Sequence, residues 1–171
     1  MDFGTVIPPE KLTEMMHARH NGAMAFRYPE NHQFRINGIV SQQLLTNTDQ
    51  LNDNSEECLI VVKDSNTTDI TVGHATGMVS FIRDDGTGEV SRELAVYNYD
   101  KKSGVFSAKG DSGSLVVDYK GHMVGMIHAG TLRGGSDRAD ITYCIPAWWL
   151  IDCIKERYQH ADFNQLTWIA V

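Results

Sequence analysis

Short apolar and alternating runs dominate the chain from residue 58 onward. Polar turn residues separate these runs, and together the two features indicate β-strands. The six runs cover residues 58–63, 68–82, 90–97, 114–118, 122–129 and 140–145. Short strands at this spacing predict a closed antiparallel barrel or a sandwich.

One clear helix follows the last predicted strand. After Pro146, the apolar residues Trp148, Ile151 and Ile154 recur with Tyr158 at helical spacing. Charged residues occupy the opposite face, which is the pattern of an amphipathic surface helix. We therefore expect the strand-rich region to end in an α-helix.

The first 57 residues differ from the rest of the chain in the elements that their residue pattern predicts. Residues 9–19 predict a helix, whereas 2–7 and 34–40 predict short strands. Residues 46–57 are rich in Asn, Asp and Ser and predict a linker. We therefore divide the chain into 1–57 and 58–171.

Composition and charge exclude several functions. The formal net charge of −7 and the absence of clustered Lys and Arg argue against a nucleic-acid partner. No apolar stretch approaches the length of a membrane span, and no secretory signal is present as written, so a complete chain is expected in the cytoplasm. The three cysteines fit no metal motif and are expected to be buried thiols. We expect neither a cofactor nor a metal.

Residues 109–114 read Lys-Gly-Asp-Ser-Gly-Ser and carry the candidate chemistry. Gly110 allows a tight turn, and Ser112 supplies a hydroxyl for attack on a carbonyl. The N–H groups of Gly110 and Ser112 together are suited to hold the oxyanion of a tetrahedral intermediate. Asp111 is expected to fix the loop by burying its carboxylate among local donors. A Gly-rich hairpin loop with a solvated serine is the alternative interpretation.

The region 58–158 resembles the second barrel of the trypsin/chymotrypsin-like serine protease family. The resemblance rests on Gly110-Asp111-Ser112-Gly113, on the strand Gly125–Gly130 and on the C-terminal helix. Ser114 is similar to the residue that bacterial glutamyl endopeptidase-type members carry after this motif. The stretch is also similar to uncharacterised trypsin-like proteins of mushroom-forming fungi. The resemblance implies a mostly β fold with a six-stranded antiparallel barrel over 58–145, a C-terminal helix and a largely absent first barrel.

The same resemblance implies further site residues. His128, Ala129 and Gly130 stand on the strand that lines the substrate pocket in that family. A histidine near this position in glutamyl endopeptidases contacts acidic substrate side chains, so His128 implies such a preference. A half-buried strand histidine is the plainer interpretation of His128.

A catalytic base is harder to find. The archetype places its His roughly 140 residues before the Ser, and only 111 residues precede Ser112. Asp2, in Asp2–Val6, resembles the family's catalytic Asp, at a spacing longer than the archetype's roughly 90 residues. Alternatively, His20, oriented by Asp49 or Asp53, is the base of a compact protease. A histidine at the end of a helix is the plainer interpretation of His20, and His17 offers no better candidate.

Three hypotheses follow for a domain that resembles a serine endopeptidase acting on a peptide or protein. The chain is a truncated protease, inactive alone; or a pseudoprotease that binds proteins or peptides; or a compact protease that uses His20. In the first two cases the face that would meet a first barrel is exposed, so we expect self-association through it.

Overall fold

The computed structural model describes the chain except for residues 5, 18–25, 53, 84–85, 132–140 and 164–171. The described part contains seven strands and three helices. In chain order they are α1 (Pro9–Met15), α2 (Gln42–Thr46), β1 (Gln50–Leu51), β2 (Glu57–Lys63), β3 (Thr71–Arg83), β4 (Val90–Asn98), β5 (Leu115–Asp118), β6 (Met123–Gly130), β7 (Ile141–Pro146) and α3 (Ala147–Arg157).

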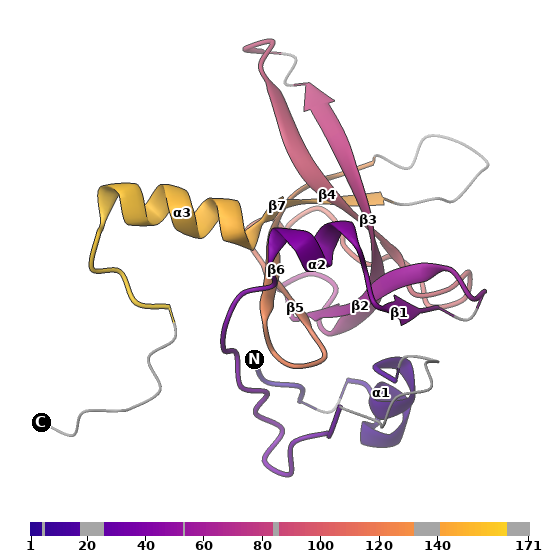
Figure 1. The fold of residues 1–171 in the computed structure, drawn as a ribbon. Helices are drawn as coiled ribbons and strands as arrows, with labels where there is room; N and C mark the ends of the chain where they lie inside the picture. The colour runs from indigo at the N-terminus through magenta and orange to yellow at the C-terminus, as the bar shows by residue number, and fades with distance from the viewer. Residues whose placement is uncertain (5, 18–25, 53, 84–85, 132–140, 164–171) are drawn as a thin grey trace, which may run out of the picture.

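Six of the strands close into an antiparallel barrel (Figure 1). The order is β2-β3-β4-β7-β6-β5, and β5 pairs back onto β2. Closure leaves no free barrel edge, and β1 adds a short outer pairing to β2. The prediction of a mostly β fold with a six-stranded antiparallel barrel and a C-terminal helix is confirmed.

The barrel is filled by side chains from each of its six strands. Leu59 and Val61 of β2 point inward, where they meet Val96, Val124 and Ile127. The intervening residues of β2 point outward, yet they are buried as well. This two-sided burial explains why the sequence of β2 is a continuous apolar run rather than an alternating one.

The N-terminal segment covers the outward face of β2 and its neighbours. Phe3, Leu12, Met16 and Phe26 are buried there in one cluster with Ile60 and other outward side chains of the barrel. Figure 1 shows α1 beside the end of the barrel that carries β1 and β2. The described part of this segment up to Phe34 therefore contributes a second apolar layer to the fold.

Two sequence predictions in this segment are wrong, and one is confirmed in part. Residues 34–40 form no strand, because Gly38 takes a positive φ of 65° and only an isolated bridge joins Ile39 to Met123. Within 2–7, the described residues make a single bridge, from Asp2 to Gln33. The helix predicted over 9–19 is present as α1, which ends at Met15.

Two short elements in the N-terminal segment escaped prediction. Helix α2 begins after Ser41, whose hydroxyl accepts a hydrogen bond from the N–H of Leu44. Strand β1 lies within the predicted linker 46–57. Both are too short to give a clear period in the sequence.

The cysteines are free thiols. Cys58 and Cys144 are buried, as expected, and Cys153 is half-buried. Burial, with a smaller contribution from Glu56, raises the pKa of Cys58 to about 11.

The turn between β5 and β6 requires glycine at position 121. Gly121 has a φ of +81°, and a Cβ there would collide with the carbonyl oxygen of Arg35. Gly104 has a nearly equal φ of +80°, but open space surrounds its missing Cβ.

We expect Gly121→Ala to lower the free energy of unfolding clearly more than Gly104→Ala does. Left-handed backbone strain alone costs about 1–2 kcal/mol, and only position 121 adds a backbone collision. Urea unfolding of both variants measures the difference. Equal losses would contradict a collision with Arg35.

Candidate active site

The Lys109–Ser114 loop, which contains the predicted nucleophile, lies between β4 and β5. Two turns shape it. The N–H of Asp111 donates to the carbonyl oxygen of Ala108, and the N–H of Ser114 donates to the carbonyl oxygen of Asp111. The N–H of Gly113 also donates to the carbonyl oxygen of Ile127 at 2.8 Å. The N–H of Ile127 donates to the carbonyl oxygen of Ser114 at 2.9 Å. The loop is therefore held against β6.

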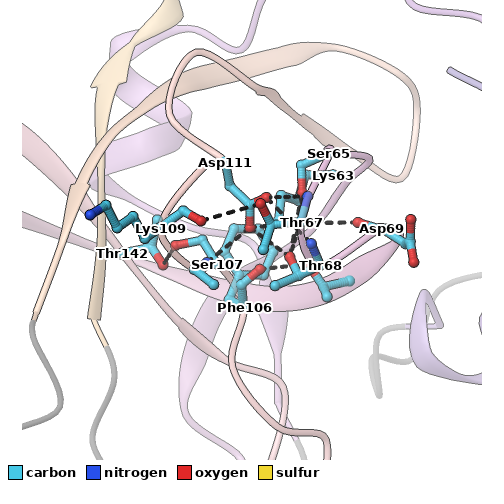
Figure 2. A network of polar contacts seen from close by, with 12 residues as sticks. Lys63, Ser65, Thr67, Thr68, Asp69, Phe106, Ser107, Lys109, Asp111 and Thr142 are labelled. Atoms are coloured by element: carbon cyan, nitrogen blue, oxygen red, sulfur yellow. Dashed lines mark hydrogen bonds and ion pairs between the residues drawn. The ribbon is translucent and has the colours of Figure 1, made fainter.

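Asp111 anchors this loop in the protein interior. Its side chain is fully buried. Oδ1 accepts hydrogen bonds from the N–H groups of Thr67 at 2.9 Å and Thr68 at 3.3 Å. Oδ2 accepts from the Thr68 hydroxyl at 2.7 Å and from the Ala108 N–H at 2.9 Å. Figure 2 shows these contacts converging on one carboxylate.

These donors decide the charge of Asp111. Burial opposes ionisation of the carboxyl group, but the hydrogen bonds, led by that of the Thr68 hydroxyl, outweigh it and hold the pKa of Asp111 well below its ordinary value. The expectation that Asp111 buries its carboxylate among local donors agrees with this geometry.

Lys63 completes the buried network. Its Nζ lies 3.8 Å from Oδ2 of Asp111. It donates to the hydroxyls of Ser65 at 2.5 Å and Thr68 at 2.6 Å, and to the carbonyl oxygen of Asp69 at 3.0 Å. Burial lowers the pKa of Lys63, while the Asp111 carboxylate opposes that shift. Sequence reasoning missed Lys63, although a charged residue that ends an apolar run was a signal.

Ser112 is exposed beside β6. Its hydroxyl donates to the carbonyl oxygen of His128 at 3.3 Å. Among the described residues, the N–H groups of Gly110 and Ser112 donate no hydrogen bond. Gly110 has a φ of +108°, and a Cβ there would collide with the Thr67 hydroxyl. The loop thus contains an exposed serine and two backbone donors that bond to no described residue.

The three predicted pocket residues lie at the end of β6. The pairing of β6 with β7 shifts register between Ile127 and Ala129, so His128 lies in a bulge. The His128 side chain is exposed, and its Nδ1 lies 2.6 Å from Oε1 of the buried Glu93. Sequence reasoning missed Glu93. Ala129 and Gly130 continue the pairing to β7, and the loop after residue 131 lies outside the described residues.

The structure does not bring Asp2 and Ser112 together by any hydrogen bond within the described residues. Asp2 is exposed, and its Oδ1 accepts from the N–H of Gly4 at 2.8 Å. His20 and Asp53 lie outside the described residues, and Asp49 is exposed. Ser112, Gly110 and His128 are therefore the predicted site residues that share one place.

Comparison with known proteins assigns the chain to no family. No protein-family model matches the chain. No curated protein matches it either. In the part of the chain that the structure describes, no helix is long and apolar enough to cross a membrane.

Proposed function

We propose that this chain is a serine-endopeptidase-like domain that forms an acyl-enzyme on Ser112. The observation that carries the proposal is the Lys109–Ser114 loop: a buried, multiply hydrogen-bonded Asp111 holds an exposed Ser112 hydroxyl beside the free N–H groups of Gly110 and Ser112. The resemblance of Gly110–Gly113 to the trypsin-like nucleophile motif supports the same function.

The chemistry follows from these groups. The Ser112 oxygen attacks a peptide carbonyl carbon, and the carbonyl oxygen becomes an oxyanion. The N–H groups of Gly110 and Ser112 stabilise that oxyanion, because the buried Asp111 fixes their directions before the reaction begins. Collapse of the intermediate expels the amine, and water then hydrolyses the acyl-enzyme.

A second candidate is a peptide-binding module without catalysis. The resting hydrogen bond of Ser112 favours it, because the hydroxyl donates to a backbone carbonyl rather than to an imidazole nitrogen. A carbonyl oxygen of this kind accepts no proton during catalysis. Reactivity of Ser112 decides between the two candidates.

Labelling with a fluorophosphonate probe tests the proposed function. We expect the purified chain to be labelled on Ser112 and Ser112→Ala to fall to background, because the probe reacts only with an activated serine. Ser114→Ala is the matched control, since Ser114 belongs to the same loop but precedes β5, and it should keep full labelling. A folded chain that takes up no probe would favour the binding module.

A further inference from the structure

The residue beside Ser112 carries an imidazole that is itself held by a carboxylate. The Ser112 hydroxyl contacts the main chain of His128, and the ring of His128 contacts Glu93. Ser112 follows β4 in the chain, Glu93 lies within β4, and His128 lies on β6. Three separate segments therefore bring Ser112 to the main chain of His128 and the His128 ring to Glu93.

Glu93 is an unusual residue for a barrel strand. It is only 1% exposed, whereas the His128 side chain is 52% exposed. Its Oε1 accepts hydrogen bonds from the Ser91 hydroxyl at 2.7 Å and faces Nδ1 of His128 at 2.6 Å. Its Oε2 is buried without a hydrogen-bond partner among the described residues. A buried carboxylate with so few donors is costly unless it pairs with a positive charge.

Two further groups lie within reach of the Glu93 carboxylate. Burial chiefly, and then the charge of Glu93, raise the pKa of the buried Cys144 thiol. The imidazole of His128 faces this carboxylate through Nδ1. An imidazolium formed on His128 during a reaction would lie beside the carboxylate that already faces its Nδ1.

We propose that His128 is the general base for Ser112 and that Glu93 is its positioning residue. This inference rests on the proposed function. In this arrangement Glu93 accepts the Nδ1–H of His128, and the lone pair of the ring lies on Nε2. The half-exposed ring lies on the residue that Ser112 already contacts, so the base comes from the same barrel as the nucleophile.

The proton balance is complete with these groups. As the Ser112 oxygen bonds to the substrate carbonyl carbon, its proton passes to Nε2 of His128, which becomes an imidazolium beside Glu93. Breakage of the C–N bond returns that proton to the leaving amine. In deacylation Nε2 takes a proton from water, the new C–O bond forms, and the proton returns to Ser112 as the acid leaves.

One rearrangement is required. The Ser112 hydroxyl must exchange the His128 carbonyl for the His128 ring when substrate binds. Catalytic hydrogen bonds are often long or misaligned without substrate and form only in the complex. The Ser112 side chain is exposed, so no buried packing resists its rotation, while the His128 ring keeps its contact with Glu93.

The experiment compares fluorophosphonate labelling rates of the full chain and its variants. A general base contributes about 100-fold or more to such rates, so we expect His128→Gln and His128→Ala to lose at least that factor. In His128→Gln, the glutamine amide still donates to Glu93 but accepts no proton from Ser112. This variant therefore removes the base while keeping the buried Glu93 carboxylate satisfied. Added imidazole should restore labelling of His128→Ala.

His122→Ala is the matched control, because His122 also faces a buried carboxylate, that of Asp118 at 3.1 Å, but lies in the β5–β6 turn.

Glu93→Gln separates positioning from structure. The glutamine amide can donate to Nδ1, which moves the imidazole proton to Nε2 and removes the lone pair that the reaction needs. We expect labelling to fall about 100-fold or more, and nitrogen NMR of labelled histidine to report the change of tautomer.

Two failures are distinguishable. If the wild-type chain is not labelled at Ser112, the proposed function itself is wrong. If the wild type is labelled and a folded His128→Gln is labelled at the same rate, Ser112 is reactive but His128 is not its base.

Discussion

Asp111→Asn should cost about 3–5 kcal/mol of the free energy of unfolding, the usual penalty for breaking a buried ion pair from one side. The Lys63 side chain is 0% exposed, and the asparagine would leave its ammonium buried without the carboxylate that now faces it. It would also present an NH₂ group where Asp111 now accepts hydrogen bonds from Thr67, Thr68 and Ala108. Fluorophosphonate labelling should fall with stability, because the same carboxylate holds the Lys109–Ser114 loop.

Urea unfolding measures this loss, and two further variants interpret it. Asp100→Asn is the control, because Asp100 also accepts from two backbone N–H groups, those of Lys102 and Ser103, but in an exposed turn. It should cost no more than about 1 kcal/mol. Lys63→Met combined with Asp111→Asn should recover part of the loss, because it removes the uncompensated charge. A double variant less stable than Asp111→Asn alone would contradict the ion-pair explanation.

The low pKa of Asp111 also predicts a pH dependence. A group whose folded pKa is depressed stabilises the fold above its unfolded pKa, about 3.9 for Asp, and loses that contribution as pH falls through the folded value. We therefore expect wild-type stability to decrease below about pH 4. Asp111→Asn should lack this part of the decrease.

Phe106→Ala should cost about 3–5 kcal/mol, the range for removing a buried aromatic ring. Phe106 is 1% exposed, and its ring packs directly on Gly73 of β3. The main chain is held at both ends, because its N–H donates to the Asn98 side chain at 2.8 Å and its carbonyl oxygen accepts from the Thr71 hydroxyl at 2.7 Å. The ring thus fixes the point at which the loop toward Ser112 leaves the barrel.

The matched control is Phe81→Ala. Phe81 lies on β3 as well, but it is 69% exposed and contacts Arg92 through a cation–π pair at 5.9 Å. Its removal should change stability by no more than about 1 kcal/mol. Thermal unfolding of both variants tests the contrast, and a Phe106→Ala variant as stable as Phe81→Ala would contradict this role of the ring.

The strands and the terminal helix could be predicted because their signals are local. Continuous apolar runs, turn residues between them and the helical spacing after Pro146 are all visible within a few residues. The register of the barrel is not local, since Val61 pairs with both Gly73 and Asp118. Gly38 broke the predicted strand 34–40 because the chain there must turn along the β5–β6 turn, whose residues are far away in sequence.

The same argument applies to the candidate site. The Lys109–Ser114 loop could be recognised because its residues are adjacent. Lys63 and Glu93 were missed because each acquires its role from a partner on another segment, Asp111 and His128 respectively. A charged residue inside an apolar strand is the signal that such a partner exists, but the sequence does not say which residue it is.

Barrel closure through β2 and β5 sets an order of events during synthesis on the ribosome. Strand β2 emerges early, but its partner β5 follows only after β3, β4 and the long loop between β4 and β5. During that interval the inward residues of β2, such as Val61, lack their β5 partner and remain prone to aggregate. Its outward residues have a cover already, because Phe3, Leu12 and Phe26 precede β2 in the chain. The N-terminal segment can therefore cover one face of the nascent barrel before β5 closes it.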